Sequence, residues 1–150
     1  MAENCILERS EILETIPQGE PFVFLDQAAI AEKSATGRYR IRGSEVFMPG
    51  HFPGRPVFPA SIMVEALGQL AIAYIMYCYA EDGVQADSIY FLKSEDVHCQ
   101  RKCLPGDGLE MTVRLLRVRE PLIVFAGEIS VDGEQALKVT SFTLSFATAP

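Results

Sequence analysis

The feature that most constrains the fold is an apolar run of twenty residues, 61–80, whose only charged side chain is Glu65. Such a run is long enough to span a bilayer. However, Glu65 and Gln69 lie four residues apart and share one face of a helix, where a charge would be costly in lipid. Glu81 and Asp82 follow the run, where a membrane span would carry basic anchors. The run therefore predicts a helix that is buried in a protein core.

A rigid loop precedes this helix and begins at His51. Prolines and glycines at positions 49–50, 53–54, 56 and 59 restrict its backbone, and such loops commonly hold catalytic groups. Pro59 also suits a helix entrance, where its missing N–H does no harm. A lone histidine is usually a surface or core residue without a catalytic role, and a glutamate near a helix start usually complements the helix dipole. A histidine and a carboxylate in one apolar pocket instead suit general acid–base chemistry near neutral pH, so we select His51 and Glu65 as candidates.

The composition places bounds on the class of protein. The chain of 150 residues has the size of one domain, and we treat 1–150 as a single unit. Its net charge of −7 argues against a nucleic-acid partner. The first four residues lack a basic segment and no early apolar stretch follows, so we expect a cytoplasmic protein with reduced cysteines. His98, Cys99 and Cys103 match no common zinc spacing, and on one strand the two cysteines would lie about 13 Å apart. We therefore expect no metal site.

The hydrophobic pattern predicts one long helix among antiparallel strands. A short amphipathic helix is expected at 5–16, stopped by Pro17. Strands are expected at 22–25 with a continuation to 31, at 34–42, at 88–92 extending through 97–102, at 109–118, at 122–131 and at 136–146. The alternation becomes ambiguous at Leu115 and Leu116. The fold class is α+β, with the helix packed on one face of a curled sheet.

The segment HFPGRPVFPASIMVEALGQ closely resembles the signature of the beta-hydroxyacyl-acyl carrier protein dehydratases. These are hot-dog enzymes, in which a curled antiparallel sheet wraps a long central helix. Their pattern is H-F-P-G-x-P-V-x-P-G followed by E-A-x-x-Q, and the separation of 14 residues between histidine and glutamate also agrees. The matching residues are His51, Phe52, Pro53, Gly54, Pro56, Val57, Pro59, Glu65, Ala66 and Gln69. IPQGEPFVFLD resembles the opening motif P-H-R-x-P-F-x-x-x-D, and FLKSEDVHCQRKCLPGD resembles a later strand with its P-G-D turn.

The resemblance implies a reaction, a set of site residues and partners. Water would leave a (3R)-hydroxyacyl thioester on acyl carrier protein and give the trans-2-enoyl thioester, with no metal or redox cofactor. His51 would be the base and Glu65 the acid. The oxyanion and substrate-positioning residues would be Ala60, Ser61, Gln69, Phe52 and Gly54. The resemblance also implies a homodimer or a trimer of dimers, with histidine and glutamate from different subunits and the acyl chain in an apolar tunnel beside the helix.

Three departures from the family pattern bear on function. Ala60 replaces a glycine, and Gln18 and Gly19 replace a His-Arg pair. The negative net charge opposes docking of an acidic carrier protein, so docking requires a local basic patch. The candidates for this patch are Arg101, Lys102, Arg114, Arg117 and Arg119, with Arg55 near the tunnel mouth.

Alternative functions stay open at this point. One alternative is a related dehydratase-isomerase, but that branch carries aspartate at the position of Glu65, so Glu65 argues against it. Another is a hot-dog thioesterase, and the HFPG loop argues against that function. The departures at Ala60, Gln18 and Gly19 leave room for a non-catalytic acyl-binding or scaffold subunit. The acyl chain length does not follow from the sequence, because it depends on how residues such as Phe58, Met63, Leu67 and Phe91 pack.

Overall fold

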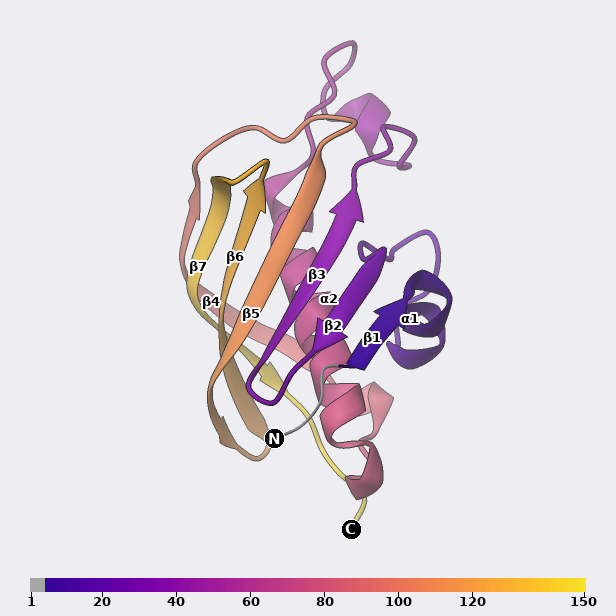
Figure 1. The fold of residues 1–150 in the computed structure, drawn as a ribbon, viewed down its shortest axis with the longest axis vertical. Helices are drawn as coiled ribbons and strands as arrows, with labels where there is room; N and C mark the ends of the chain where they lie inside the picture. Colours follow the sequence, from indigo (N-terminus) through magenta and orange to yellow (C-terminus); the bar gives the residue numbers. More distant parts are fainter. Residues whose placement is uncertain (1–4) are drawn as a thin grey trace.

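A seven-stranded antiparallel sheet curls around one long helix, α2 (Figure 1). The computed structural model describes residues 5–150, so the first four residues used in the argument on targeting lie outside it. The strand order is β1-β2-β3-β5-β6-β7-β4. The elements are β1 Cys5–Glu8, α1 Arg9–Thr15, β2 Gln27–Ile30, β3 Ser34–Arg40, η1 Met48–Gly50, α2 Ala60–Cys78, η2 Ala80–Asp82, η3 Ala86–Ser88, β4 Tyr90–Cys99, β5 Gly108–Arg119, β6 Leu122–Val131 and β7 Glu134–Ser145. The predicted α+β class is confirmed.

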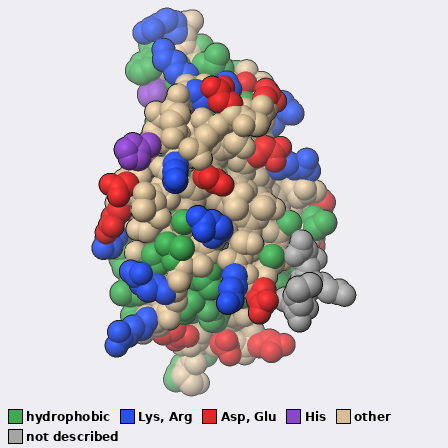
Figure 2. Space-filling view, turned by 60° about the vertical axis from the view of Figure 1, so that its left-hand side comes forward, with side chains coloured by type: hydrophobic (Ala, Val, Ile, Leu, Met, Phe, Trp, Pro, Cys, Tyr) green, Lys and Arg blue, Asp and Glu red, His purple; other side chains and the backbone are tan. Residues whose placement is uncertain are grey.

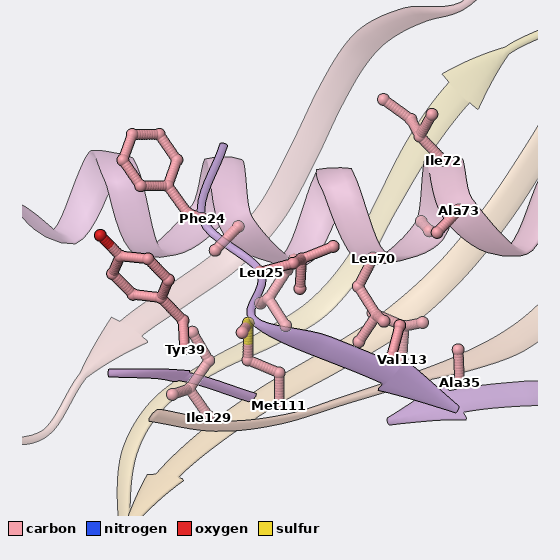
Figure 3. Close-up of a cluster of buried hydrophobic side chains, with 14 of the residues drawn as sticks. Phe24, Leu25, Ala35, Tyr39, Leu70, Ile72, Ala73, Met111, Val113 and Ile129 are labelled. Carbon is pink, nitrogen blue, oxygen red and sulfur yellow. The ribbon is translucent and has the colours of Figure 1, made fainter. Parts of the chain in front are cut away.

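Helix α2 is the core of the molecule. Its length and composition would allow it to cross a membrane. However, every residue from Ala66 to Ile75 is buried in the protein, which confirms the prediction of a core helix. Leu70 of the helix points toward Val113 of β5 (Figure 3), and both side chains belong to the buried core.

Glycines mark the places where sheet and helix approach most closely. A Cβ atom added at Gly37 of β3 would lie 3.1 Å from a methyl group of Leu70 on α2. A Cβ atom at Gly127 of β6 would lie 3.0 Å from Leu67 on α2 and 3.1 Å from Phe142 on β7. The sheet therefore lies directly on the helix at these two strands because both positions lack a side chain.

The segment 5–16 differs from the predicted helix. Only Arg9–Thr15 is helical, and Cys5–Glu8 forms an edge strand that pairs with β2, with Cys5 opposite Ile30 and Glu8 opposite Gln27. Glu8 ends the strand and begins the helix through a capping box with Glu11. The strand forms because it satisfies the open edge of β2, a tertiary contact that local periodicity does not encode.

The predicted strand at 22–25 is also wrong, since the regular strand β2 begins only at Gln27. Val23, Phe24 and Leu25 are nevertheless buried. The side chain of Gln69 on α2 takes the place of a neighbouring strand. Its Oε1 accepts a hydrogen bond from Phe24 N at 2.8 Å, and its Nε2 donates to Phe22 O at 2.9 Å.

The later strands agree with the sequence pattern, with two informative details. The pairing of β5 with β6 shifts register between Leu115 and Arg117, which explains the ambiguous alternation there. Strand β4 ends at Cys99, so the expectation that Cys99 and Cys103 share a strand is wrong. Cys103 is buried in the following loop, and its backbone carbonyl accepts a hydrogen bond from Phe58 N at 2.8 Å.

We predict that Gly127→Val destabilises the protein by about 1–3 kcal/mol, because the added methyl groups overpack the contact with Leu67 and Phe142. Gly19→Ala is the matched control, since a Cβ atom there meets no atom within 4 Å. Urea unfolding measures both variants. Equal stability of the two would show that the sheet does not rest on the helix at this strand.

Candidate active site

His51 lies where the 3-10 helix η1 ends. Its backbone N–H donates to Met48 O at 3.1 Å, and its carbonyl accepts from Val57 N at 2.7 Å. The ring atom Nδ1 lies 2.7 Å from Val57 O. A carbonyl oxygen can only accept, so Nδ1 carries the proton in this contact and Nε2 of the neutral ring is left with a free lone pair. The loop thus presents Nε2 of His51 as a proton acceptor.

The tip of the loop is a tight turn. Phe52 N donates to Arg55 O at 3.0 Å, and Arg55 N donates to Phe52 O at 2.9 Å. Gly54 closes the turn with φ of 72°, a conformation that favours glycine. The Phe52 ring stacks on His51 with centroids 4.2 Å apart, and the Arg55 guanidinium lies 5.7 Å from the Phe52 centroid. The imidazole is therefore held between its own hydrogen bond and an aromatic ring.

A cluster of aromatic side chains in the core packs against the loop. Phe24, Tyr39 and Phe58 are almost fully buried, and each lies within 6.2 Å of another ring of the cluster. Phe47, from the loop itself, packs on Phe24 at 5.9 Å and on Phe58 at 5.7 Å. The loop that carries His51 is therefore anchored in the core rather than lying free on the surface.

Two carboxylates that the sequence analysis did not select hold the chain leading into this loop. Glu45 accepts hydrogen bonds from Tyr39 OH at 2.5 Å, from Arg42 N at 3.0 Å and from Gly43 N at 2.8 Å. These bonds keep the pKa of Glu45 low although burial opposes its charge. Asp26 accepts from Arg40 N at 2.8 Å and from the Arg42 guanidinium at 2.7 Å. Asp26 is the final aspartate of the opening motif, which is the signal that could have found it.

Glu65 is partly buried in the second turn of α2. Burial raises the pKa of its carboxyl group above the usual value, and a hydrogen bond from Gln69 partly opposes this effect. The bond joins Gln69 Nε2 to Glu65 Oε2 at 3.1 Å. The raised pKa favours a protonated carboxyl group, which is the form that acts as an acid.

Gln69 is fully buried, and its amide has a fixed orientation. Phe24 N–H occupies Oε1, so Nε2 must face Glu65 and can only donate to it. When Glu65 is protonated, its proton must therefore lie on Oε1, the oxygen that Gln69 does not contact. Gln69 was predicted to be a substrate-positioning residue, and in the structure its amide contacts the candidate acid and the backbone of Phe22 and Phe24.

The start of α2 offers two free donors. Ile62 N and Met63 N both donate to Pro59 O. The N–H groups of Ala60 and Ser61 have no backbone acceptor within residues 5–150, as expected for a first helical turn. Ala60 is helical and is not among the described residues with positive φ, so the backbone does not require the family's glycine.

The described chain does not join all the predicted residues. No hydrogen bond or ion pair links His51 to Glu65 within residues 5–150. At the other departures from the family pattern, Oε1 of Gln18 is buried and has no hydrogen-bond partner among the residues that the structure describes, and Gly19 O accepts from Phe22 N at 2.8 Å. Within residues 5–150, no group of three His, Cys, Asp or Glu side chains is placed to hold a metal ion.

The basic residues fall into two groups rather than one patch. Arg101 is paired with Asp107 at 3.2 Å and with Glu134 at 3.0 Å, so its charge is neutralised. It lies with Lys102 in the loop before β5. Arg117 and Arg119 lie at the other end of β5, roughly 35 Å from its first residue, and Arg114 lies between.

Comparisons with known proteins agree with this geometry. The model of the FabA-like domain matches residues 16–140. The chain is 31% identical to the "3-hydroxyacyl-[acyl-carrier-protein] dehydratase FabZ" of Paramagnetospirillum magneticum, over 90% of this chain and 84% of that protein. It is also 31% identical to the protein of the same name from Proteus mirabilis, over 91% of each chain.

Solved structures show the same fold at low sequence identity. The dehydratase heterocomplex ApeI:P from Xenorhabdus doucetiae contains a chain that superposes with a TM-score of 0.78 at 20% identity, over 91% of both chains. The fluoroacetyl-CoA thioesterase FlK superposes with a TM-score of 0.63 at 14% identity, over 79% of this chain and 87% of that one. The arrangement of sheet and helix is therefore that of the hot-dog fold.

We predict that Glu65→Gln raises the melting temperature at pH 7 and that this gain disappears near pH 4. The folded state holds the carboxyl group with a raised pKa, so ionising it as the pH rises costs folding stability. Below the unfolded pKa of about 4.3 the carboxyl group is neutral in both states and the penalty is absent. Thermal melts of the two proteins between pH 4 and pH 8 measure the difference. A gain that stays constant over this range would contradict the assigned burial.

Proposed function

The chain belongs to the FabA-like family and is a 3-hydroxyacyl-[acyl-carrier-protein] dehydratase of the hot-dog fold, and on this premise we propose that His51 and Glu65 are its catalytic base and acid. The observation that carries the proposal is the bond from Nδ1 of His51 to Val57 O, which leaves Nε2 free to take a proton. The substrate is a (3R)-hydroxyacyl thioester, and the products are the trans-2-enoyl thioester and water.

The reaction removes a weakly acidic proton next to the thioester carbonyl. Nε2 of His51 takes this proton from Cα, and the electron pair moves toward the thioester oxygen. The N–H groups of Ala60 and Ser61 are the donors that stabilise the resulting negative charge, aided by the positive end of the helix dipole. One oxyanion-hole donor typically contributes 10²–10³-fold in rate.

The second half of the reaction expels the β-hydroxyl group. Glu65 donates its Oε1 proton to this hydroxyl, the Cβ–O bond breaks, and the electron pair from Cα forms the double bond. Water leaves, while His51 is protonated and Glu65 is ionised. The next cycle begins after a proton returns from the imidazolium to the carboxylate, so the enzyme consumes no net proton.

A second copy of the chain is proposed to complete the site. Strand β4 is an edge strand of the sheet, next to β7, and all ten of its residues are exposed in the single chain. Its exposed apolar side chains include Tyr90, Leu92 and Val97. A solvent-exposed edge of this length pairs readily with another strand. We therefore propose a homodimer through β4, with His51 and Glu65 of each site drawn from different subunits.

His51→Ala and Glu65→Gln are each expected to lower turnover by at least about 10²-fold, the smaller end of a general acid–base contribution. The assay adds crotonyl carrier protein and follows the loss of the conjugated enoyl absorbance as water adds. Circular dichroism and gel filtration check that the fold and oligomeric state are unchanged. Near-normal rates in either variant would contradict the assigned roles. Release of free carrier thiol instead would identify a thioesterase, and an inert wild-type protein would favour an acyl-binding subunit.

Mixing the two inactive variants tests whether the site is shared. A heterodimer of the two carries one site with both native groups, and random exchange makes half the dimers mixed, so activity should return to about a quarter of the wild-type value. A site built within one chain would stay inactive after mixing. Unfolding and refolding the variants together ensures that the subunits exchange.

The proposed carrier-docking surface lies at the turn between β5 and β6. Leu116, Val118 and Leu122 are exposed there beside Arg117 and Arg119. Figure 2 shows several basic side chains around hydrophobic ones in the lower half of that view. Because Arg101 is neutralised by its own ion pairs, this turn is the stronger candidate for an acidic partner.

The double variant Arg117→Glu and Arg119→Glu is expected to raise KM for a carrier-bound substrate roughly tenfold at low salt, since it reverses the charge that steers the acidic carrier. The N-acetylcysteamine thioester of the same acyl group has no carrier and should be used at the normal rate. Lys138→Glu on β7 is the charge control. Equal losses with both substrates would show damage to the site rather than to docking.

The protein is proposed to act in the cytoplasm. All four cysteines are free thiols, which suits a reducing compartment. Fractionation of cells that produce the full-length chain tests this location, and recovery with the membranes or in an oxidising compartment would contradict it.

A further inference from the structure

Phe91 of β4 lies directly against Gly68 of α2. A Cβ atom added at Gly68 would lie 3.1 Å from Phe91 Cδ2 and 3.3 Å from Phe91 Cε2. The helix therefore has a slot at Gly68, and the phenyl ring fills it. In the family pattern E-A-x-x-Q, Gly68 occupies one of the unspecified positions, so the slot is not a requirement of the signature itself.

A strand irregularity directs Phe91 into this slot. The pairing of β4 with β7 shifts register between Phe91 and Lys93, so Leu92 is an extra residue in the edge strand. Such bulges re-aim neighbouring side chains. The Phe91 ring stacks on Phe142 with centroids 5.6 Å apart and an interplanar angle of 2°, yet it stays 37% exposed. The ring is thus held on one side by a core aromatic residue, and its other side is exposed in the single chain.

The slot lies beside the proposed acid. Gly68 follows Glu65 by three residues, so the two share a face of α2, and Ile72 continues that face. In the proposed reaction the β-carbon lies next to Glu65, and an acyl group that continues from there along this face of α2 reaches Phe91. Phe58, Met63 and Leu67 are almost fully buried in the core, and Leu67 faces Gly127 on the sheet. Phe91 is therefore the only one of the four candidate residues, which also include Phe58, Met63 and Leu67, that is placed to limit the length of the acyl chain.

We infer that Phe91 is a specificity-determining residue that restricts the acyl group to short chains by filling the slot at Gly68. The inference rests on the proposed function, because Glu65 sets where the β-carbon lies. Short acyl groups end before the ring, whereas longer ones must displace it from Phe142. The Phe91 side chain thus discriminates by exclusion rather than by contact with the reacting atoms.

The test compares 3-hydroxybutyryl and 3-hydroxydecanoyl carrier protein with the wild type and Phe91→Ala. The wild type is expected to favour the short substrate in kcat/KM by at least tenfold, and Phe91→Ala should reduce this ratio at least tenfold by improving the long one. Ile6→Ala removes an exposed apolar side chain from β1, at the opposite edge of the sheet, so its ratio should stay at the wild-type value. A ratio that Phe91→Ala leaves unchanged, or that Ile6→Ala changes equally, would overturn the inference.

A binding measurement keeps the inference testable without turnover. Calorimetry gives the affinities of the saturated butyryl and decanoyl pantetheine thioesters, which cannot react. Phe91→Ala should bind the decanoyl compound at least tenfold more tightly than the wild type does, with butyryl binding little changed. Equal decanoyl affinities would refute the role of Phe91 even in an active dehydratase. An inactive wild-type protein that still shows this shift would refute the dehydratase alone.

Discussion

The buried amide of Gln69 is the interaction on which the site and its surroundings depend. It serves as the hydrogen-bonding partner of an irregular segment, because Phe22 and Phe24 bond to it instead of to a strand. The same group fixes the carboxyl oxygen of Glu65 that receives a hydrogen bond. A buried amide whose donors and acceptor are engaged is costly to disturb, since each unpaired polar group would carry a desolvation penalty. The position of Glu65, the proposed acid, is thereby coupled to the packing of the aromatic segment against the helix.

The proposed base, His51, is held by different means. His51 is positioned by backbone contacts with Met48 and Val57 and by stacking on Phe52, so its orientation depends on the shape of the loop. That shape depends in turn on Glu45 and on the aromatic cluster below it. The proposed acid therefore belongs to the regular core, and the proposed base belongs to a loop that is held by the core. This division agrees with a site in which the two groups come from different subunits, because neither one relies on the other for its placement.

Much of this arrangement was predictable from the sequence, and the exceptions have physical causes. The helix and the strands of the second half follow from local periodicity, and the spacing of His51 and Glu65 follows from the motif. The strand at Cys5–Glu8 and the irregular path of 22–25 did not follow, because each depends on a partner remote in sequence, the edge of β2 or the side chain of Gln69. The role of Asp26 and Glu45 was missed because charged residues near a strand end look like solvated ones until their partners are known. The contact between Phe91 and Gly68, from which we infer the preference for short acyl chains, is also one that no sequence pattern reveals.

The exposure of β4 has a consequence for the life of the protein in the cell. In the proposed homodimer a partner covers β4, so a newly made subunit leaves the outer edge of this ten-residue strand unpaired, with several apolar side chains exposed, until a partner arrives. The same edge that would assemble the enzyme is a template for uncontrolled strand addition, and Lys93, Glu95 and Asp96 act against this as charged gatekeepers. Solubility, protein level and catalytic competence are then controlled together by subunit concentration. Dilution below the dissociation constant would therefore cost the enzyme both its activity and its protection from aggregation.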